Sequence, residues 1–138
     1  MKRPFGGGRP ISLFTLGTMR AVASSAQMTA VLDAAVDAGI NHLETAPAYG
    51  PAEQFLGEAI ANLARSKRAQ PHEWVITSKL LPGVNLAEGQ RQIESILKRL
   101  NRPQIDNLAI HGLNRPDHLE WARAGDGAAL LNWAISSG

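Results

Sequence analysis

Cysteine is absent from the sequence of 138 residues, and this absence excludes several kinds of chemistry. Disulfide bonds, thiolate metal sites and a cysteine nucleophile are all ruled out within this chain. The sequence also lacks an apolar run that approaches the ~20 residues of a membrane span. Its basic first residues, MKRPFGGGRP, are not followed by an apolar stretch of signal-peptide length. We therefore expect a soluble, cytoplasmic protein with no membrane partner.

Excess charge of one sign is also scarce, since 14 basic residues face 12 acidic ones and the net charge is +2. A balance this close to neutral does not indicate a nucleic-acid partner. Two basic clusters, residues 65–68 and 98–102, fall at the ends of predicted helices, where the helix dipole favours cations. We interpret them as helix-end charges rather than as a phosphate-binding patch.

Strand-like and helix-like patterns alternate along the chain. Apolar runs predict strands over residues 11–19, 40–46, 74–79 and 105–111. Helical spacing, capping residues and helix-stopping residues predict helices from Ser24 or Ser25 to Gly39, from about Ala52, from Asn85 to Pro103, and over 128–135. Asp117 is expected to cap a short turn between the last strand and the last helix.

Four strand–helix units with short linkers predict an α/β fold with a mostly parallel sheet covered by helices. Two architectures fit this pattern: a small open sheet, or half of an eight-stranded barrel. We expect one domain over residues 1–138. Residues 1–10 contain three consecutive glycines and are expected to form a flexible arm.

Polar residues stand where the predicted strands end. Glu44 lies near the end of the second strand and the only tyrosine, Tyr49, follows it, while Lys79 ends the third strand and His111 ends the fourth. The carboxyl ends of parallel strands share one edge of a sheet, and the active sites of barrel enzymes lie at this edge. Each residue alone could be structural, but four at successive strand ends favour a functional site.

These residue types suit proton transfer to a carbonyl group. A free tyrosine is a poor acid at neutral pH, but a lysine ammonium close by favours the ionised phenol, and a carboxylate can hold that ammonium in place. Such a tyrosine can protonate a carbonyl oxygen as charge develops on it, while a neutral histidine orients the same oxygen. Reduction would also require a bound hydride donor.

Several motifs resemble signatures of the aldo-keto reductase superfamily. In order they are GTMR (17–20), AGINHLETAPAYG (38–50), AEQFLGEAI (52–60), VITSKL (75–80) and SILKRLNRPQIDNLAIHGL (95–113). The resemblance implies a (β/α)8 TIM barrel, of which this chain holds about the first four βα units and is incomplete at the C-terminus. It also implies NADPH-dependent reduction of small aldehydes or ketones.

The resemblance assigns a role to each site residue. Tyr49 would be the general acid, Lys79 its tuning cation, His111 the group that orients the substrate, and Glu44 the charge partner of Lys79. Gly17, Thr18 and Glu44 would lie near the nicotinamide and its ribose. The family usually has Asp where this chain has Glu44, and a displacement of roughly an ångström can cost about 10²-fold in rate.

Length is the second departure from the family, because barrels of this type need ~250 residues. The half expected after residue 138 would hold most of the NADPH, and its absence would expose strand edges. We therefore expect either a fragment or truncated product, or a chain completed by a second half-barrel or by self-association. As a lone monomer it should bind NADPH weakly.

Three alternatives to this reading remain open. The chain could be an inactive half-barrel that serves as an assembly partner. Lys79 could form a Schiff base, as in lysine-dependent aldolases. His42 and Glu44, two residues apart on one strand, could form a metal pair, but no third ligand stands at suitable spacing, and we expect His42 to pack in the core and no metal to bind.

Overall fold

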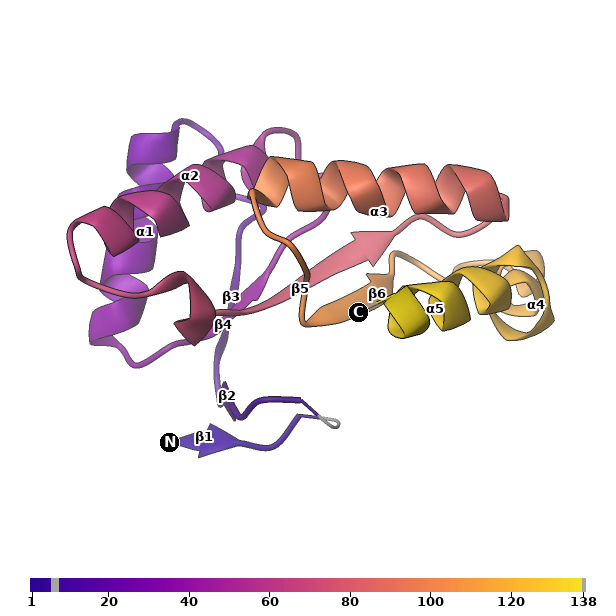
Figure 1. Cartoon of the computed structure of the whole chain (residues 1–138), viewed down its shortest axis with the longest axis horizontal. Coiled ribbons are helices and arrows are strands. Elements are labelled where there is room, and N and C mark those ends of the chain that lie inside the picture. The colour runs from indigo at the N-terminus through magenta and orange to yellow at the C-terminus, as the bar shows by residue number, and fades with distance from the viewer. Residues whose placement is uncertain (6–7, 138) are drawn as a thin grey trace.

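Four parallel strands, arranged side by side in sequence order, form the sheet that positions the site (Figure 1). They are β3 (Thr15–Gly17), β4 (His42–Glu44), β5 (Val75–Leu80) and β6 (Asn107–Ile110). The pairing register aligns Gly17 with Glu44, Glu44 with Thr77, and Thr77 with Asn107. The computed structural model describes residues 1–5 and 8–137. The α/β fold with a parallel sheet, predicted from the sequence, is confirmed.

Helices follow each strand and gather on one side of the sheet. The first three are α1 (Ser25–Asp37), α2 (Ala52–Arg65) and α3 (Leu86–Leu100); α2 packs between α1 and α3, and Figure 1 shows α3 above β5. After β6 come α4 (Pro116–Ala124) and α5 (Asp126–Ser137), and a single 3-10 turn, η1 (Pro71–Glu73), precedes β5. Leu16, Leu43 and Ile76, aligned across β3, β4 and β5, face the helices and join the main core. The site residues lie on the opposite face.

Polar side chains start the helices where the sequence predicts. Ser24 caps α1, its Oγ accepting the Gln27 N–H at 3.0 Å, and Asn85 caps α3 by accepting the Glu88 N–H at 2.9 Å. The end of α3 differs slightly from the prediction, because Asn101 takes a left-handed conformation (φ 52°) two residues before Pro103. None of the helices in the described part of the chain is long and apolar enough to cross a membrane.

Two local predictions were wrong. The strand predicted over residues 11–19 is split into β2 (Ile11–Ser12) and β3, because the Ser12 hydroxyl donates to the Phe14 carbonyl (2.6 Å) and bends the chain between them. Asp117 does not cap a turn. It lies within the first turn of α4, where its carboxylate pairs with Arg115 instead.

The predicted flexible arm includes a short strand. Lys2–Arg3 form β1, which pairs antiparallel with β2, while residues 6–7 of the arm lie outside the described residues. Near its end, Arg9 donates to the Asp106 carboxylate (2.6 Å) and to the Trp74 carbonyl (2.7 Å). Flexibility of the arm stays a prediction.

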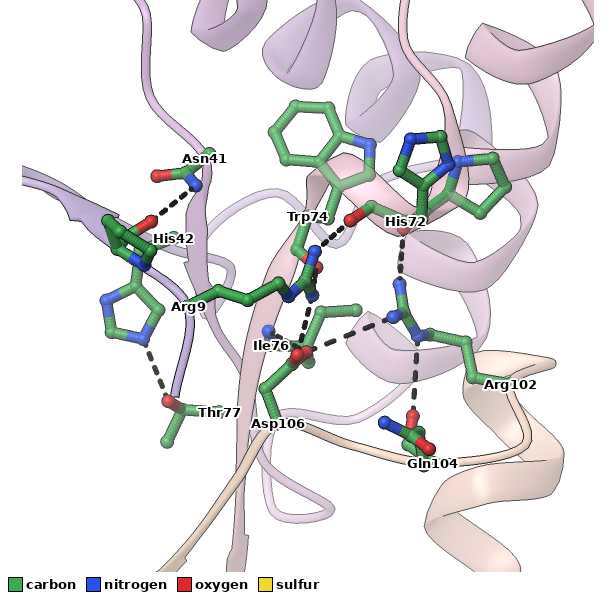
Figure 2. A network of polar contacts seen from close by, with 12 residues as sticks. Arg9, Asn41, His42, His72, Trp74, Ile76, Thr77, Arg102, Gln104 and Asp106 are labelled. Carbon is green, nitrogen blue, oxygen red and sulfur yellow. Dashed lines mark hydrogen bonds and ion pairs between the residues drawn. The ribbon is translucent and has the colours of Figure 1, made fainter. Parts of the chain in front are cut away.

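Asp106 ties the amino ends of β5 and β6 together. Figure 2 shows Arg9 and Arg102 approaching its carboxylate from two sides. The carboxylate also accepts the Ile76 N–H at 2.8 Å, and Arg102 donates to the Pro71 carbonyl at 2.8 Å. Because charge-assisted hydrogen bonds are among the stronger ones, this network holds the end of the sheet opposite the site.

An ion pair with a buried carboxylate holds α2, α3 and β5 together on the helix side of the sheet. The Glu53 side chain is completely buried, accepts from Arg99 Nε at 2.7 Å, and accepts from the Ser78 hydroxyl at 2.6 Å. Its desolvated carboxylate is therefore satisfied by one cation and one hydroxyl, and removing it leaves both donors without that partner.

Glu53→Ala should lower the free energy of unfolding by about 1.5–3 kcal/mol, the typical worth of a hydrogen bond to a charged group, because Arg99 can turn to water while the buried Ser78 hydroxyl loses its acceptor. Urea denaturation followed by circular dichroism measures this. Glu58→Ala is the matched control, because Glu58 is an exposed residue on the same helix. Equal effects of the two substitutions would show that the Glu53 pair does not stabilise the packing of α2 on α3.

Candidate functional site

The turn after β4 returns Tyr49 to the end of the strand that carries Glu44. Within this turn the Tyr49 N–H donates to the Ala46 carbonyl at 3.0 Å, and the Tyr49 carbonyl accepts the Ala52 N–H at 3.2 Å. Gly50 follows with φ 59°, a left-handed conformation that glycine adopts without strain. The tyrosine therefore stands on a short, internally bonded connection to α2.

Glu44, Tyr49 and Lys79 form one cluster at the carboxyl end of the sheet. Lys79 Nζ donates to Tyr49 Oη at 2.7 Å, and the Tyr49 hydroxyl donates to Glu44 Oε1 at 3.2 Å. Lys79 and Glu44 also form an ion pair, which closes the triangle. The Lys79 ammonium lies 4.5 Å from the centre of the Tyr49 ring as well. The lysine and the carboxylate that the sequence predicts as partners of Tyr49 are thus both in contact with it.

Lys79 is held by three oxygen atoms. Besides Glu44 and Tyr49, the Thr45 carbonyl accepts from its Nζ at 3.3 Å, so each of the three ammonium donors has an acceptor. Burial lowers the pKa of Lys79, and the Glu44 carboxylate in contact with it opposes that shift. This arrangement suits a charged lysine aimed at the phenol oxygen.

His111 completes the set of side chains predicted to converge. It follows β6 directly, and its backbone N–H donates to the Leu80 carbonyl at 2.7 Å. Its ring meets the Tyr49 ring edge-on, with centroids 5.7 Å apart and planes at 84°. Within residues 1–5 and 8–137 its buried Nδ1 has no hydrogen-bond partner. The imidazole therefore lies beside the phenol with one ring nitrogen still unpaired.

Gly17 and Thr18, the predicted cofactor residues, take different positions. Gly17 is exposed at the end of β3, and a Cβ built there would lie 3.4 Å from Glu44 Oε2. Thr18 is buried, and its hydroxyl donates to the Thr45 hydroxyl at 3.0 Å. Its N–H donates to the Glu44 carbonyl at 3.0 Å. Gly17 thus borders the site, whereas Thr18 supports the turn that carries it.

Thr45 is a site residue that the sequence analysis missed. Its carbonyl accepts a hydrogen bond from Lys79, and its hydroxyl accepts one from Thr18. Thr45 therefore links the lysine of the site to the residue that follows β3. The only available signal was its place directly after Glu44 at a strand end. A backbone carbonyl is present at every position, so residue type alone could not identify it.

His42 is buried, as predicted, but it lies on the face of β4 that carries Glu44, outside the hydrophobic core on the helix side. Its Nδ1 lies 2.8 Å from the Thr15 hydroxyl and its Nε2 lies 2.8 Å from the Thr77 hydroxyl. Burial lowers the pKa of His42, with a smaller opposing effect from Asp106. Both ring nitrogens are therefore occupied by hydroxyls, and no group of three His, Asp or Glu side chains able to hold a metal ion occurs in the described ranges.

Comparisons with known proteins agree with the geometry. The model of the aldo/keto reductase family matches residues 13–129. A structure described as an aldo-keto reductase from Pseudomonas aeruginosa is 32% identical with a TM-score of 0.78, covering 98% of this chain and 56% of that one. A second crystal structure of an aldo-keto reductase from the same organism is 31% identical with a TM-score of 0.77. That match covers 98% of this chain and 57% of the other. The crystal structure of an aldo-keto reductase of the silkworm Bombyx mori is 20% identical with a TM-score of 0.73, and the match covers 97% of this chain and 45% of the other. At this identity it supports the fold alone.

The chain therefore spans somewhat more than half the length of the two bacterial proteins it matches. The match begins at Leu13, before the first strand of the four-stranded sheet, and includes Glu44, Tyr49, Lys79 and His111. All four side chains of the candidate site thus lie in the region shared with the family.

The lowered pKa of His42 predicts a loss of stability in acid. Because the unfolded chain takes up this proton at about pH 6.5 and the folded chain only at lower pH, the stabilisation is complete above about 6.5 and is lost as the pH falls below it. His42→Gln should flatten the pH dependence of the free energy of unfolding in this acid range. Urea titrations at a series of pH values measure it, and an unchanged slope in the variant would contradict the assignment.

Proposed function

Because the chain belongs to the aldo/keto reductase family, we propose that it reduces aldehyde or ketone carbonyls to alcohols with NADPH as hydride donor. The observation that carries the proposal is the 2.7 Å hydrogen bond from Lys79 Nζ to Tyr49 Oη, next to the Glu44 carboxylate. A phenol that accepts from an ammonium is suited to release its own proton, because the ammonium stabilises the negative charge left on the oxygen.

Each side chain has one part in the proposed reaction. Tyr49 donates its phenolic proton to the carbonyl oxygen as negative charge develops there. Lys79 stabilises the phenolate that remains, and Glu44 keeps Lys79 charged and in place. His111, whose ring lies edge-on beside the Tyr49 ring, hydrogen-bonds the same carbonyl oxygen and orients the substrate. The substrate class is a small carbonyl compound.

The residues around Gly17 fit the nicotinamide end of the cofactor. NADPH, when bound, supplies the hydride that the side chains of this chain cannot supply. Gly17 is exposed beside Glu44 and carries no side chain, so it leaves room for a flat ring at the edge of the site. Thr18 acts by supporting the turn through Thr45, since its hydroxyl points inward. We expect weak NADPH binding by the 138-residue chain alone.

Glu44 also accepts a hydrogen bond from the phenolic O–H of Tyr49, the proton that the tyrosine must donate to the substrate. A phenol has one O–H donor, and in this structure that donor faces Glu44 Oε1 at 3.2 Å. The proton must leave this carboxylate before it can reach a substrate oxygen. Aldo-keto reductases usually carry the shorter Asp here, as the resemblance implies. Glu44 therefore makes proton donation slower than the same site with Asp would allow.

A Schiff-base aldolase using Lys79 is the competing enzyme class. A lysine nucleophile must be neutral, but all three donors of Lys79 face oxygen atoms and one of these belongs to a carboxylate. This geometry favours the charged lysine and hence the reductase. Treatment with borohydride and a carbonyl substrate discriminates the two, because only the aldolase would be trapped covalently.

Tyr49→Phe should lower the turnover number for NADPH-dependent carbonyl reduction by at least about 10²-fold, the usual contribution of a general acid. NADPH consumption with a panel of small aldehydes and ketones measures the rate, and NADPH fluorescence titration serves as the control for cofactor binding. A variant that kept the wild-type rate would defeat the role of Tyr49. A wild-type chain with no detectable reduction would defeat the proposed function of this chain.

Glu44→Asp should raise the turnover number by about tenfold, which corresponds to releasing one hydrogen bond to a charged group. The shorter carboxylate withdraws from the Tyr49 hydroxyl while still reaching Lys79. Glu44→Ala is the matched control and should lower the rate, because it removes the partner of Lys79. If the Asp variant were slower than wild type, Glu44 would not be restraining the proton.

A further inference from the structure

The side chain of His42 joins three strands of the sheet. Its Nδ1 lies 2.8 Å from the Thr15 hydroxyl of β3, and its Nε2 lies 2.8 Å from the Thr77 hydroxyl of β5. We call these three side chains the histidine bridge. We propose that His42 is a positioning residue, whose two hydrogen bonds hold β3, β4 and β5 in the alignment that brings Glu44 to Lys79. Its effect on catalysis rests on the reduction proposed above.

Each member of the histidine bridge stands two residues before a residue at the site. The pairs are Thr15 and Gly17, His42 and Glu44, and Thr77 and Lys79. Residues two apart along a strand point to the same face of the sheet. The bridge therefore lies on the face that carries the site, one step toward the amino ends of the same three strands.

Backbone hydrogen bonds connect this bridge to the site. The Thr77 carbonyl accepts the Thr45 N–H at 2.9 Å, and the Thr45 carbonyl accepts from Lys79 Nζ at 3.3 Å. On the other side of β4, the Glu44 carbonyl accepts the Thr18 N–H at 3.0 Å. A displacement of Thr77 along β4 would therefore move the carbonyl that Lys79 contacts.

The apolar pattern of the strands does not fix this alignment alone. Alternation opposes a slip of one residue, because such a slip turns helix-facing side chains to the other face. A slip of two residues between β4 and β5 keeps every side chain on its own face. It would separate the Thr77 hydroxyl from His42 by roughly 7 Å, the rise of two residues along a strand. The bridge thus opposes the displacement that the apolar pattern permits.

A neutral imidazole suits this bridge. It offers one donor and one acceptor, and each threonine hydroxyl can donate or accept, so both ring nitrogens are satisfied in either tautomer. Burial lowers the pKa of His42, which favours the neutral form. The Phe5 ring also packs against the imidazole, with centroids 5.5 Å apart. The histidine ring is therefore held by packing as well as by its two hydrogen bonds.

Paired substitutions at Thr77 test the proposal without replacing the imidazole. Thr77→Val removes the hydroxyl and keeps the shape of the side chain, whereas Thr77→Ser keeps the hydroxyl. Thr77→Val should lower the turnover number for carbonyl reduction by about tenfold or more, because a misplacement of roughly an ångström can cost about 10²-fold. Thr77→Ser should keep the wild-type rate. The KM for the carbonyl and the dissociation constant of NADPH should stay unchanged in both variants, because the bridge lies away from the carboxyl end of the sheet.

Substitutions of His42 supply a second comparison. His42→Phe removes both hydrogen bonds of the bridge. Adding Thr77→Val to it should not lower the rate further, because residues that act through one bridge have non-additive effects. His42→Gln keeps a donor and an acceptor on its amide and should lose less activity than His42→Phe. Additive losses in the double variant, or equal rates for the Gln and Phe variants, would contradict the proposed role.

Amide hydrogen exchange, followed by NMR, gives a readout that requires no catalysis. In His42→Phe, the Thr45 and Thr18 N–H groups should exchange at least about tenfold faster, while the amides of α3 keep their wild-type rates, because only the strand alignment loosens. Ile96→Val is the matched control, since Ile96 is a fully buried residue of α3 in the helix-side core. It should lower stability without slowing reduction and without selectively speeding exchange at Thr45 and Thr18.

The two readouts separate failure of this inference from failure of the proposed function. If the wild-type chain reduced no carbonyl compound, the proposed function would fail, and the exchange rates alone would decide whether His42 aligns the strands. Equal turnover in Thr77→Val and Thr77→Ser would overturn the inference. Exchange that rises in α3 as much as at Thr45 in His42→Phe would also overturn it, because His42 would then contribute only to overall stability.

Discussion

The register between β4 and β5 is the constraint on which the candidate site depends. It aligns Glu44 with Thr77, so Lys79 projects from the same face of the sheet two residues further on. Only then does the ammonium reach Glu44, Tyr49 and the Thr45 carbonyl together. A slip of one residue would turn Lys79 toward the helices and bring Ser78 to the site face. Every chemical role proposed for the side chains at the carboxyl end of the sheet depends on that alignment.

Strand β5 carries a charged cluster on each of its faces. On the helix side, Ser78 donates to Glu53, which Arg99 neutralises, and this pair joins α2 to α3. On the open side, Lys79 joins Glu44 and Tyr49. At the amino end, Asp106 accepts the Ile76 N–H and binds Arg9. The strand is thus fixed from three directions, which is what a rigid site requires, since small misplacements of reacting groups are costly.

The sequence predicted the strand ends better than the contacts between them. Apolar runs mark where strands stop. The positions of Glu44, Lys79 and His111 at the carboxyl end of the sheet therefore followed from the parallel topology. The direct contact of Glu44 with the Tyr49 hydroxyl did not follow, because it depends on how far one additional methylene reaches. The pairing of Arg9 with Asp106, 97 residues apart, has no local signal at all. The bend at Ser12 was missed because a hydroxyl can satisfy a backbone carbonyl in place of a strand partner.

Family membership and the cluster geometry together make proton donation by Tyr49 the central claim, and Lys79 is the residue that tests it most directly. Lys79→Met keeps the length of the side chain and removes the charge that faces the phenol oxygen. We predict that the rate of NADPH-dependent carbonyl reduction falls by at least about 10²-fold in this variant while the protein stays folded. An unchanged rate would contradict the account, because the ammonium would then have no part in proton transfer.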